Sequence, residues 1–72
     1  MKVIYKEPGK TAEFRDIPNT LEALQEAVGG YIEIVRVTSE IIAIVDEEGK
    51  LKGAQPNVIG LVGPVVFCGT SG

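Results

Sequence analysis

The stretch NTLEALQEAVGGYIE, residues 19–33, contains the clearest structural signal in the chain. Leu21, Leu24 and Val28 recur at helical spacing, so their side chains share one apolar face, while glutamate and glutamine side chains occupy the other. The pattern predicts a helix over residues 20–28. A helix of so few turns is not stable alone in water, so it is expected to pack on a sheet.

Both ends of this helix carry the residues that usually begin and end one. Asn19 is a favourable N-cap, and Glu22 three residues later completes a pair that resembles a capping box. Gly29 suits the left-handed conformation that commonly follows the last helical residue. Start, apolar face and stop therefore agree on one short helix.

The segment before the helix is expected to form a β-hairpin. Val3–Tyr5 is rich in residues that favour strands, and residues 11–17 alternate loosely between apolar and polar side chains. Residues 7–10, Glu-Pro-Gly-Lys, form a turn signal because proline presets φ and glycine permits the reversal.

The segment after the helix is expected to form a meander. Strands are predicted at Tyr31–Val37, at the continuous apolar run Ile41–Val45 and, as a short return strand, from Leu51. Polar turns at residues 38–40 and 46–49 separate them.

The last part of the chain is rich in glycine and ends in a β segment at Val65–Cys68. With the elements above, it predicts an α+β fold: a small, curved antiparallel sheet of about five strands with one short helix packed on it. Residues 1–72 are expected to form a single domain, since a chain of 72 residues has room for only one core.

A core of this size is only marginally stable, and small domains often depend on disulfides, metals or self-association. Cys68 is the only cysteine and histidine is absent, so neither an intrachain disulfide nor a good zinc site is expected. Self-association, as a homo-oligomer, remains the available source of extra stability.

The same residue inventory argues against an enzyme. Without histidine the usual general base is missing, and Cys68 lies in an apolar run with no cationic neighbour to activate it. Cys68 is therefore expected to be a buried or half-buried strand thiol. No cofactor or metal is expected, because residues 46–48 resemble a solvated acidic turn and residues 60–63 match no nucleotide-binding loop.

Charge and hydropathy restrict the partners and the location. The formal net charge is −3, so binding to a nucleic-acid polymer, which normally uses a basic patch, is not expected. The apolar runs are too short to span a bilayer or to act as a signal peptide, so no membrane association is expected. A lone thiol without a signal fits the cytoplasm.

Arg15 and Arg36 are the only arginines, and each falls at an outward position of an expected strand. Solubility is the ordinary role of such residues, but a guanidinium can also hold a carboxylate or phosphate. Tyr5 and Tyr31 are expected to be half-buried sheet residues, and either ring could also stack on a base.

Three segments, residues 17–33, 46–53 and 55–57, resemble a family of small uncharacterised proteins, a domain-of-unknown-function family. Its members are common in Gram-positive bacteria, their phages and their mobile elements. This chain departs from the family pattern at Asp46, usually asparagine, and at Gln55, usually proline. It also has Val58 where arginine is usual. The resemblance implies an α+β fold and no established activity.

The phage-linked resemblance suggests a first function hypothesis, by analogy with small phage proteins that counter host defence. On this view the chain is a non-catalytic homo-oligomer that sequesters a small anionic nucleotide signal, in the host cytoplasm if it is phage-encoded. The pocket is expected between subunits. The residues expected to line it are Arg15, Tyr31, Arg36, Asn57, Gly60 and Gly63.

A second hypothesis belongs to another class. The acidic surface and an open strand edge would suit an interaction protein that binds a host or phage protein and inhibits or regulates it.

Overall fold

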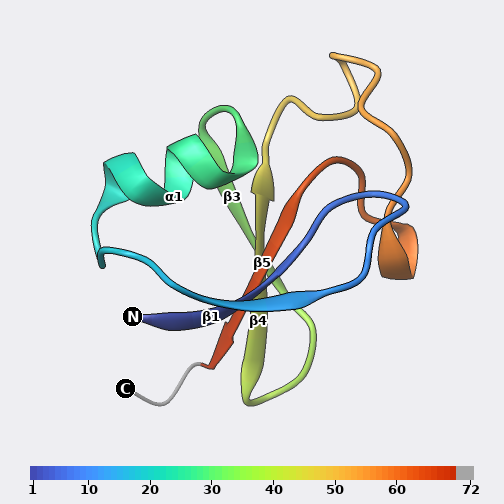
Figure 1. Cartoon of the computed structure of the whole chain (residues 1–72). Coiled ribbons are helices and arrows are strands. Elements are labelled where there is room, and N and C mark those ends of the chain that lie inside the picture. Colours follow the sequence, from blue (N-terminus) through green and yellow to red (C-terminus); the bar gives the residue numbers. More distant parts are fainter. Residues whose placement is uncertain (70–72) are drawn as a thin grey trace.

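A computed structural model describes residues 1–69 of the chain. Strands and one helix succeed each other as β–β–α–β–β–β, with a single turn of 3₁₀-helix before the last strand (Figure 1). The elements are β1 (Lys2–Lys6), β2 (Glu13–Asp16), α1 (Leu21–Val28), β3 (Ile32–Arg36), β4 (Ile41–Asp46), η1 (Val58–Gly60) and β5 (Val65–Gly69).

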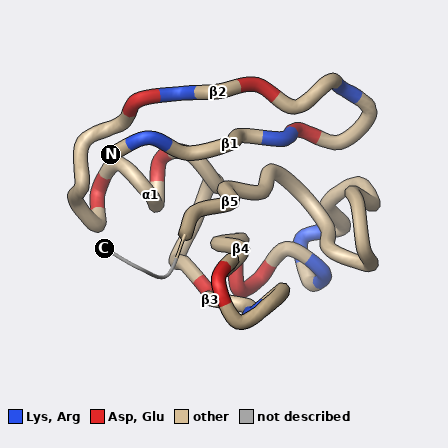
Figure 2. The backbone as a smooth tube through the Cα atoms, turned by 90° about the horizontal axis from the view of Figure 1, so that it is seen from below, with Lys and Arg blue, Asp and Glu red and all other residues tan. Residues whose placement is uncertain are grey.

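The five strands form one twisted antiparallel sheet in the order β2-β1-β5-β4-β3, which Figure 2 shows from top to bottom. Strand β5, from the C-terminal end of the described chain, lies in the centre between β1 and β4. Helix α1 lies over one face (Figure 1), and no α-helix within residues 1–69 lies over the other. The α+β fold expected from the sequence is confirmed.

We call the side beneath α1 the helix-covered face. It is filled by alternate residues of the central strands, among them Tyr5, Ile44 and Val66, which pack with Val28 of the helix. Partly buried apolar side chains of the helix, including Leu24, complete this cluster. The predicted apolar face of the helix is therefore the one that seals the core.

We call the opposite side the helix-free face. A row of directly opposed residues crosses all five strands there, in the order Phe14, Ile4, Phe67, Ala43 and Val35. Part of this face is closed, because Leu61 of the long β4–β5 connection packs against Ala43, Val45 and Val65. Phe14 at the β2 end of the row is 88% exposed.

The helix begins one residue later than the sequence indicates. Thr20, not Asn19, is the N-cap: its backbone is extended, and its hydroxyl accepts a hydrogen bond from Ala23 N at 3.2 Å. The capping box predicted on Asn19 and Glu22 is therefore wrong, because the first helical residue is Leu21. At the other end Gly29 adopts φ 84°, so the predicted left-handed stop is confirmed.

The return strand predicted from Leu51 is also wrong. Residues 47–53 form successive turns, held by hydrogen bonds such as Lys52 N to Glu48 O at 2.9 Å. The free side of β4 is taken by β5, whose Val66 stands opposite Ile44. The apolar β5 buries more surface there than the polar Leu51 segment would, so the meander stops after β4.

Among residues 1–69, no helix combines the length and the apolar character needed to cross a bilayer.

Candidate functional site

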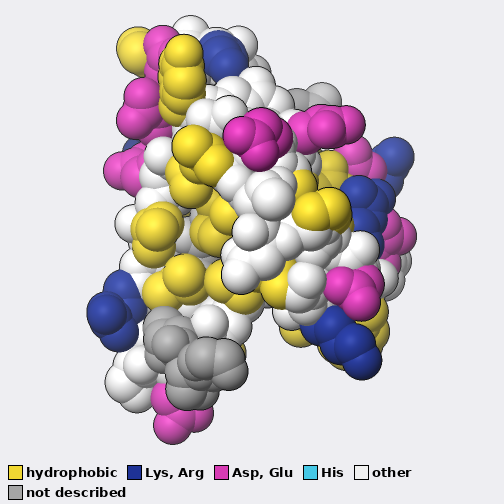
Figure 3. All heavy atoms as spheres, turned by 90° about the vertical axis from the view of Figure 1, so that its left-hand side faces the viewer, with side chains coloured by type: hydrophobic (Ala, Val, Ile, Leu, Met, Phe, Trp, Pro, Cys, Tyr) yellow, Lys and Arg dark blue, Asp and Glu magenta, His cyan; other side chains and the backbone are white. Residues whose placement is uncertain are grey.

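The helix-free face contains an apolar hollow of about 370 Å³ that extends over β2, β1, β5 and β4. It lies at the end of the sheet where β1 and β4 begin and β5 ends. Figure 3 shows hydrophobic side chains exposed around a hollowed part of the surface. Its lining residues are Lys2, Val3, Ile4, Phe14, Ile41, Phe67, Cys68 and Gly69.

Strand pairing explains why these side chains meet. Ile4 stands directly opposite Phe14 on one side and Phe67 on the other, so three large apolar groups share one row. Ile41 stands opposite Gly69, whose missing side chain leaves space beside it. Because β2 is an edge strand and no described element lies over this end, Phe14, Ile4 and Ile41 stay exposed.

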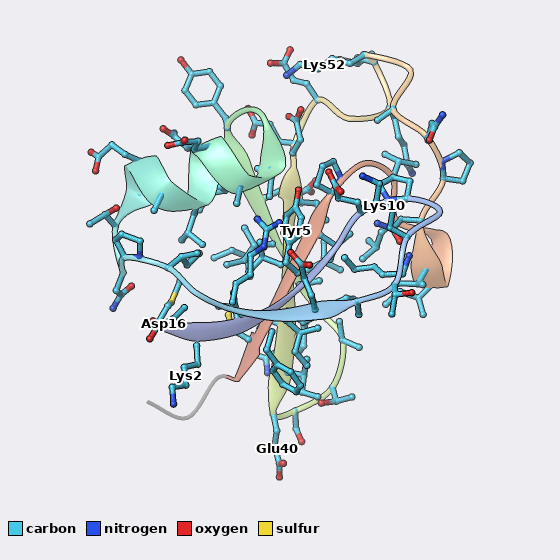
Figure 4. All side chains as sticks on the ribbon, in the orientation of Figure 1. Lys2, Tyr5, Lys10, Asp16, Glu40 and Lys52 are labelled. Carbon is cyan, nitrogen blue, oxygen red and sulfur yellow. The ribbon has the colours of Figure 1, made fainter. Side chains whose placement is uncertain are left out.

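The hollow has little polar character. Of the lining residues within 1–69, Lys2 alone is charged, and it stands opposite Asp16 on the neighbouring strand (both labelled in Figure 4). Cys68 is half-buried, one of the two alternatives expected from the sequence, and burial raises the pKa of its thiol. A raised pKa keeps this sulfur protonated near neutral pH and weakens it as a nucleophile. The hollow is suited to binding apolar groups rather than to acid–base chemistry.

The two arginines named from the sequence lie far apart in the sheet. Arg15 is on β2 and Arg36 is on β3, the two opposite edge strands. The Arg15 guanidinium lies 3.9 Å from the centre of the Tyr5 ring and pairs with Glu13. Within one chain these two cations cannot hold the same small anion.

Asn57 has a structural role in the β4–β5 connection. Its amide nitrogen donates hydrogen bonds to Lys6 O at 2.9 Å and Gly63 O at 2.8 Å. Its amide oxygen accepts from Val58 N at 2.8 Å and from Lys6 Nζ at 3.3 Å. These bonds fasten the connection to the end of β1.

The other residues named for ligand binding are also dispersed. Tyr31 is 66% exposed and precedes the first residue of β3, so the half-buried sheet position expected for it is wrong. Its backbone oxygen accepts a hydrogen bond from Glu47 N at 2.9 Å. Gly60 lines a second hollow of about 260 Å³ near Lys50, while Gly63 is buried. The six residues do not converge within one chain, and a pocket that joins them across subunits stays a prediction.

Sequence reasoning missed the role of Asp46. It belongs to β4 and is 8% exposed, so its assignment to a solvated turn is wrong. Lys52 Nζ (labelled in Figure 4) donates to Asp46 Oδ2 at 2.9 Å and to Gly29 O at 3.2 Å. These bonds tie the end of the helix to the end of β4 and to the turns after it.

The hydrogen bond from Lys52, together with one from Glu48 N, holds the pKa of Asp46 below its usual value. The Asp46–Lys52 ion pair also explains why Gly30 follows Gly29 after the helix. A Cβ on Gly30 would lie 2.7 Å from Asp46 Oδ1. In the sequence, Gly29-Gly30 together with Asp46 and Lys52, six residues apart, was the signal from which this ion pair could have been predicted.

Within residues 1–69 there is no group of three or more histidine, cysteine, aspartate or glutamate side chains that could hold a metal ion.

The fold and the hollow define a class: a small α+β protein with a half-covered antiparallel sheet and an exposed apolar surface. A family model described as "Domain of unknown function (DUF3846)" matches residues 1–72. The chain therefore belongs to this family, and the uncharacterised family suggested by the sequence is confirmed. No significant match was found among curated proteins or among solved structures.

Proposed function

We propose that this protein is a non-catalytic binding module that engages a segment of another protein through the helix-free face. The observation that carries the proposal is the side chain of Phe14, 88% exposed beside an apolar hollow of about 370 Å³. Clustered exposed apolar side chains of this kind are typical of interaction sites.

The lining indicates what the partner segment should offer. Ile4, Ile41 and Phe67 make the hollow suitable for a large aliphatic or aromatic side chain. Lys2 places a single positive charge in the same lining, so a carboxylate next to that apolar side chain is favoured. The expected occupant is a protein segment in which a large apolar residue is followed by an acidic one.

Sequestration of a nucleotide signal is less well supported. Among the residues of the lining that the structure describes, only Lys2 and Cys68 carry a side-chain hydrogen-bonding group with which to recognise a base or ribose. Arg15 and Arg36, named for the phosphate, lie on opposite edge strands. Nucleotide binding is therefore kept as an alternative outcome of the same experiment.

The test is an NMR titration of the isotope-labelled full chain with two synthetic pentapeptides, Gly-Leu-Phe-Glu-Gly and Gly-Leu-Phe-Lys-Gly, both blocked at their ends. We expect the acidic peptide to shift the amide signals of Ile4, Phe14 and Phe67. The basic peptide should bind at least about tenfold more weakly, because its lysine meets Lys2.

Lys2→Glu should reverse this preference. Lys10→Glu is the matched control, since it makes the same charge change at an exposed turn outside the hollow. Shifts elsewhere, or none with either peptide, would overturn the proposal. Saturable shifts at the hollow with a cyclic nucleotide, and none with the peptides, would favour sequestration instead.

A further inference from the structure

Strand β2 ends the sheet with an unpaired edge. It pairs only with β1, and no other strand within residues 1–69 lies along its outer side. All four of its residues are exposed. An exposed edge presents backbone donors and acceptors that can pair with another strand.

The hydrogen bonds at one end of β2 fix which backbone groups point outward. Ile17 N donates to Met1 O at 2.9 Å, and the Met1 amine donates to Ile17 O, so these two residues exchange both bonds. Such pairs alternate with non-bonded pairs along an antiparallel ladder. Arg15 and Glu13 therefore bond inward to β1, and the N–H and C=O of Phe14 point away from the sheet.

We propose that β2 pairs with β2 of a second copy of this chain, antiparallel, about a two-fold axis at Phe14. In this register Phe14 stands opposite the partner's Phe14, and their outward N–H and C=O groups exchange hydrogen bonds. Glu13 stands opposite the partner's Arg15, and Arg15 stands opposite the partner's Glu13.

The side chains are complementary in this register. Directly opposed residues lie on the same face of a sheet, so the two Phe14 rings meet on the helix-free side. The two Glu–Arg pairs meet on the helix-covered side. They occupy non-hydrogen-bonded positions of the backbone ladder, where opposed side chains approach most closely. Arg15 and Glu13 are 44% and 53% exposed, so both are accessible to a partner.

Other registers of the same edge are unfavourable. An axis at Glu13, Arg15 or Asp16 would place like charges opposite each other. At Glu13 or Arg15 it would also face backbone groups that already bond to β1. An axis between two residues would place a residue whose N–H and C=O point away from β1 opposite a residue whose N–H and C=O point toward its own β1. Such a pair cannot exchange backbone hydrogen bonds. The sequence Glu13-Phe14-Arg15 is thus complementary to an antiparallel copy of itself in one register, which favours a copy over an unrelated strand.

The pairing would join two five-stranded sheets into one continuous sheet, with the two hollows on the same side and the Phe14 rings between them. It does not depend on whether the hollow binds a protein segment. Its test can therefore fail while the peptide titration succeeds, and the reverse.

The experiment is sedimentation equilibrium of the full chain over a wide range of concentrations. We expect a monomer–dimer equilibrium. Arg15→Glu and, separately, Glu13→Arg should each weaken the dimer at least about tenfold, because both cross-strand pairs become like-charged. The double variant Glu13→Arg with Arg15→Glu restores self-complementarity in reversed order and should restore the dimer.

Arg36→Glu is the matched control, because it makes the same charge change on the opposite edge strand. Circular dichroism of each variant checks that the fold is retained. A monomer at all concentrations would overturn the proposal. A dimer whose dissociation constant is unchanged by the single charge reversals would also overturn it. So would failure of the double variant to restore the dimer.

Discussion

The two faces of the sheet are made by the same five strands, yet only one of them is closed. On the helix-covered face, Val66 is 0% exposed and Val28 of the helix is 2% exposed. On the helix-free face the β4–β5 connection covers only the part of the sheet around Val45 and Val65, and Phe14 remains 88% exposed. The comparison teaches that this small domain takes its stability mainly from one face and leaves the other available for binding.

The sharpest test of this division compares Ile44 with Phe14. Ile44→Ala should lower the free energy of unfolding by about 2–4 kcal/mol, because it removes a side chain that is 3% exposed and leaves a cavity. Phe14→Ala should change it by less than about 0.5 kcal/mol, because little area is lost from the core. Urea denaturation at low protein concentration measures both. Similar losses in the two variants would refute the division.

The second test concerns how the helix is held to its face at the C-terminal end. Asp46→Asn should lower the free energy of unfolding by about 1 kcal/mol. It weakens the bond to Lys52, whose side chain is 49% exposed and therefore partly screened. Glu48→Gln is the matched control, since only the backbone N–H of Glu48 bonds to Asp46.

The pH dependence of stability should carry the same signature. The pKa of Asp46 is lowered in the folded state, so its charged form contributes stability above the ordinary value of 3.8. That contribution is lost as the pH falls through the folded pKa. Between about pH 5 and about pH 2, the free energy of unfolding measured by urea denaturation should fall less steeply for Asp46→Asn than for the wild type. Equal slopes would show that Asp46 does not contribute to the pH dependence of the stability.

The third and smallest test concerns the N-terminal end of the helix. Thr20→Ala should lower the free energy of unfolding by about 0.5–1 kcal/mol, because the hydrogen bond to Ala23 N is lost. Asn19→Ala should have a smaller effect, since Thr20 is the cap. Thermal denaturation followed by circular dichroism compares the two. A larger loss with Asn19→Ala would support the original capping assignment instead.

The elements that local residue chemistry decides were predictable. The helix and its Gly29 stop follow from side-chain spacing and from the freedom of glycine to adopt positive φ. The strand expected from Leu51 is wrong because a local pattern does not show that β5 takes the free side of β4. The solvated turn expected at Asp46 is wrong for a similar reason, since the turns between Asp46 and its partner Lys52 bring the two side chains together.

The candidate site was harder to predict because it depends on strand order. Arg15 and Arg36 are candidates by residue type alone, and the strand order β2-β1-β5-β4-β3 places them at opposite edges of the sheet. The hollow involves Ile4 and Phe67, which come from the two ends of the described chain. No local spacing relates such distant residues. Phe14 carried a usable signal, as an apolar residue between two charged ones in a short strand.

The central position of β5 has a consequence for how the protein folds as it is synthesised. The hairpins β1–β2 and β3–β4 join neighbouring segments and can form early, but β5 lies between them and is made after both. Pairing of Ile4 with Phe67 must close a loop over most of the chain. Such non-local pairing slows folding. On the ribosome the two hairpins must therefore wait, with their inner edges unpaired, until the last strand emerges.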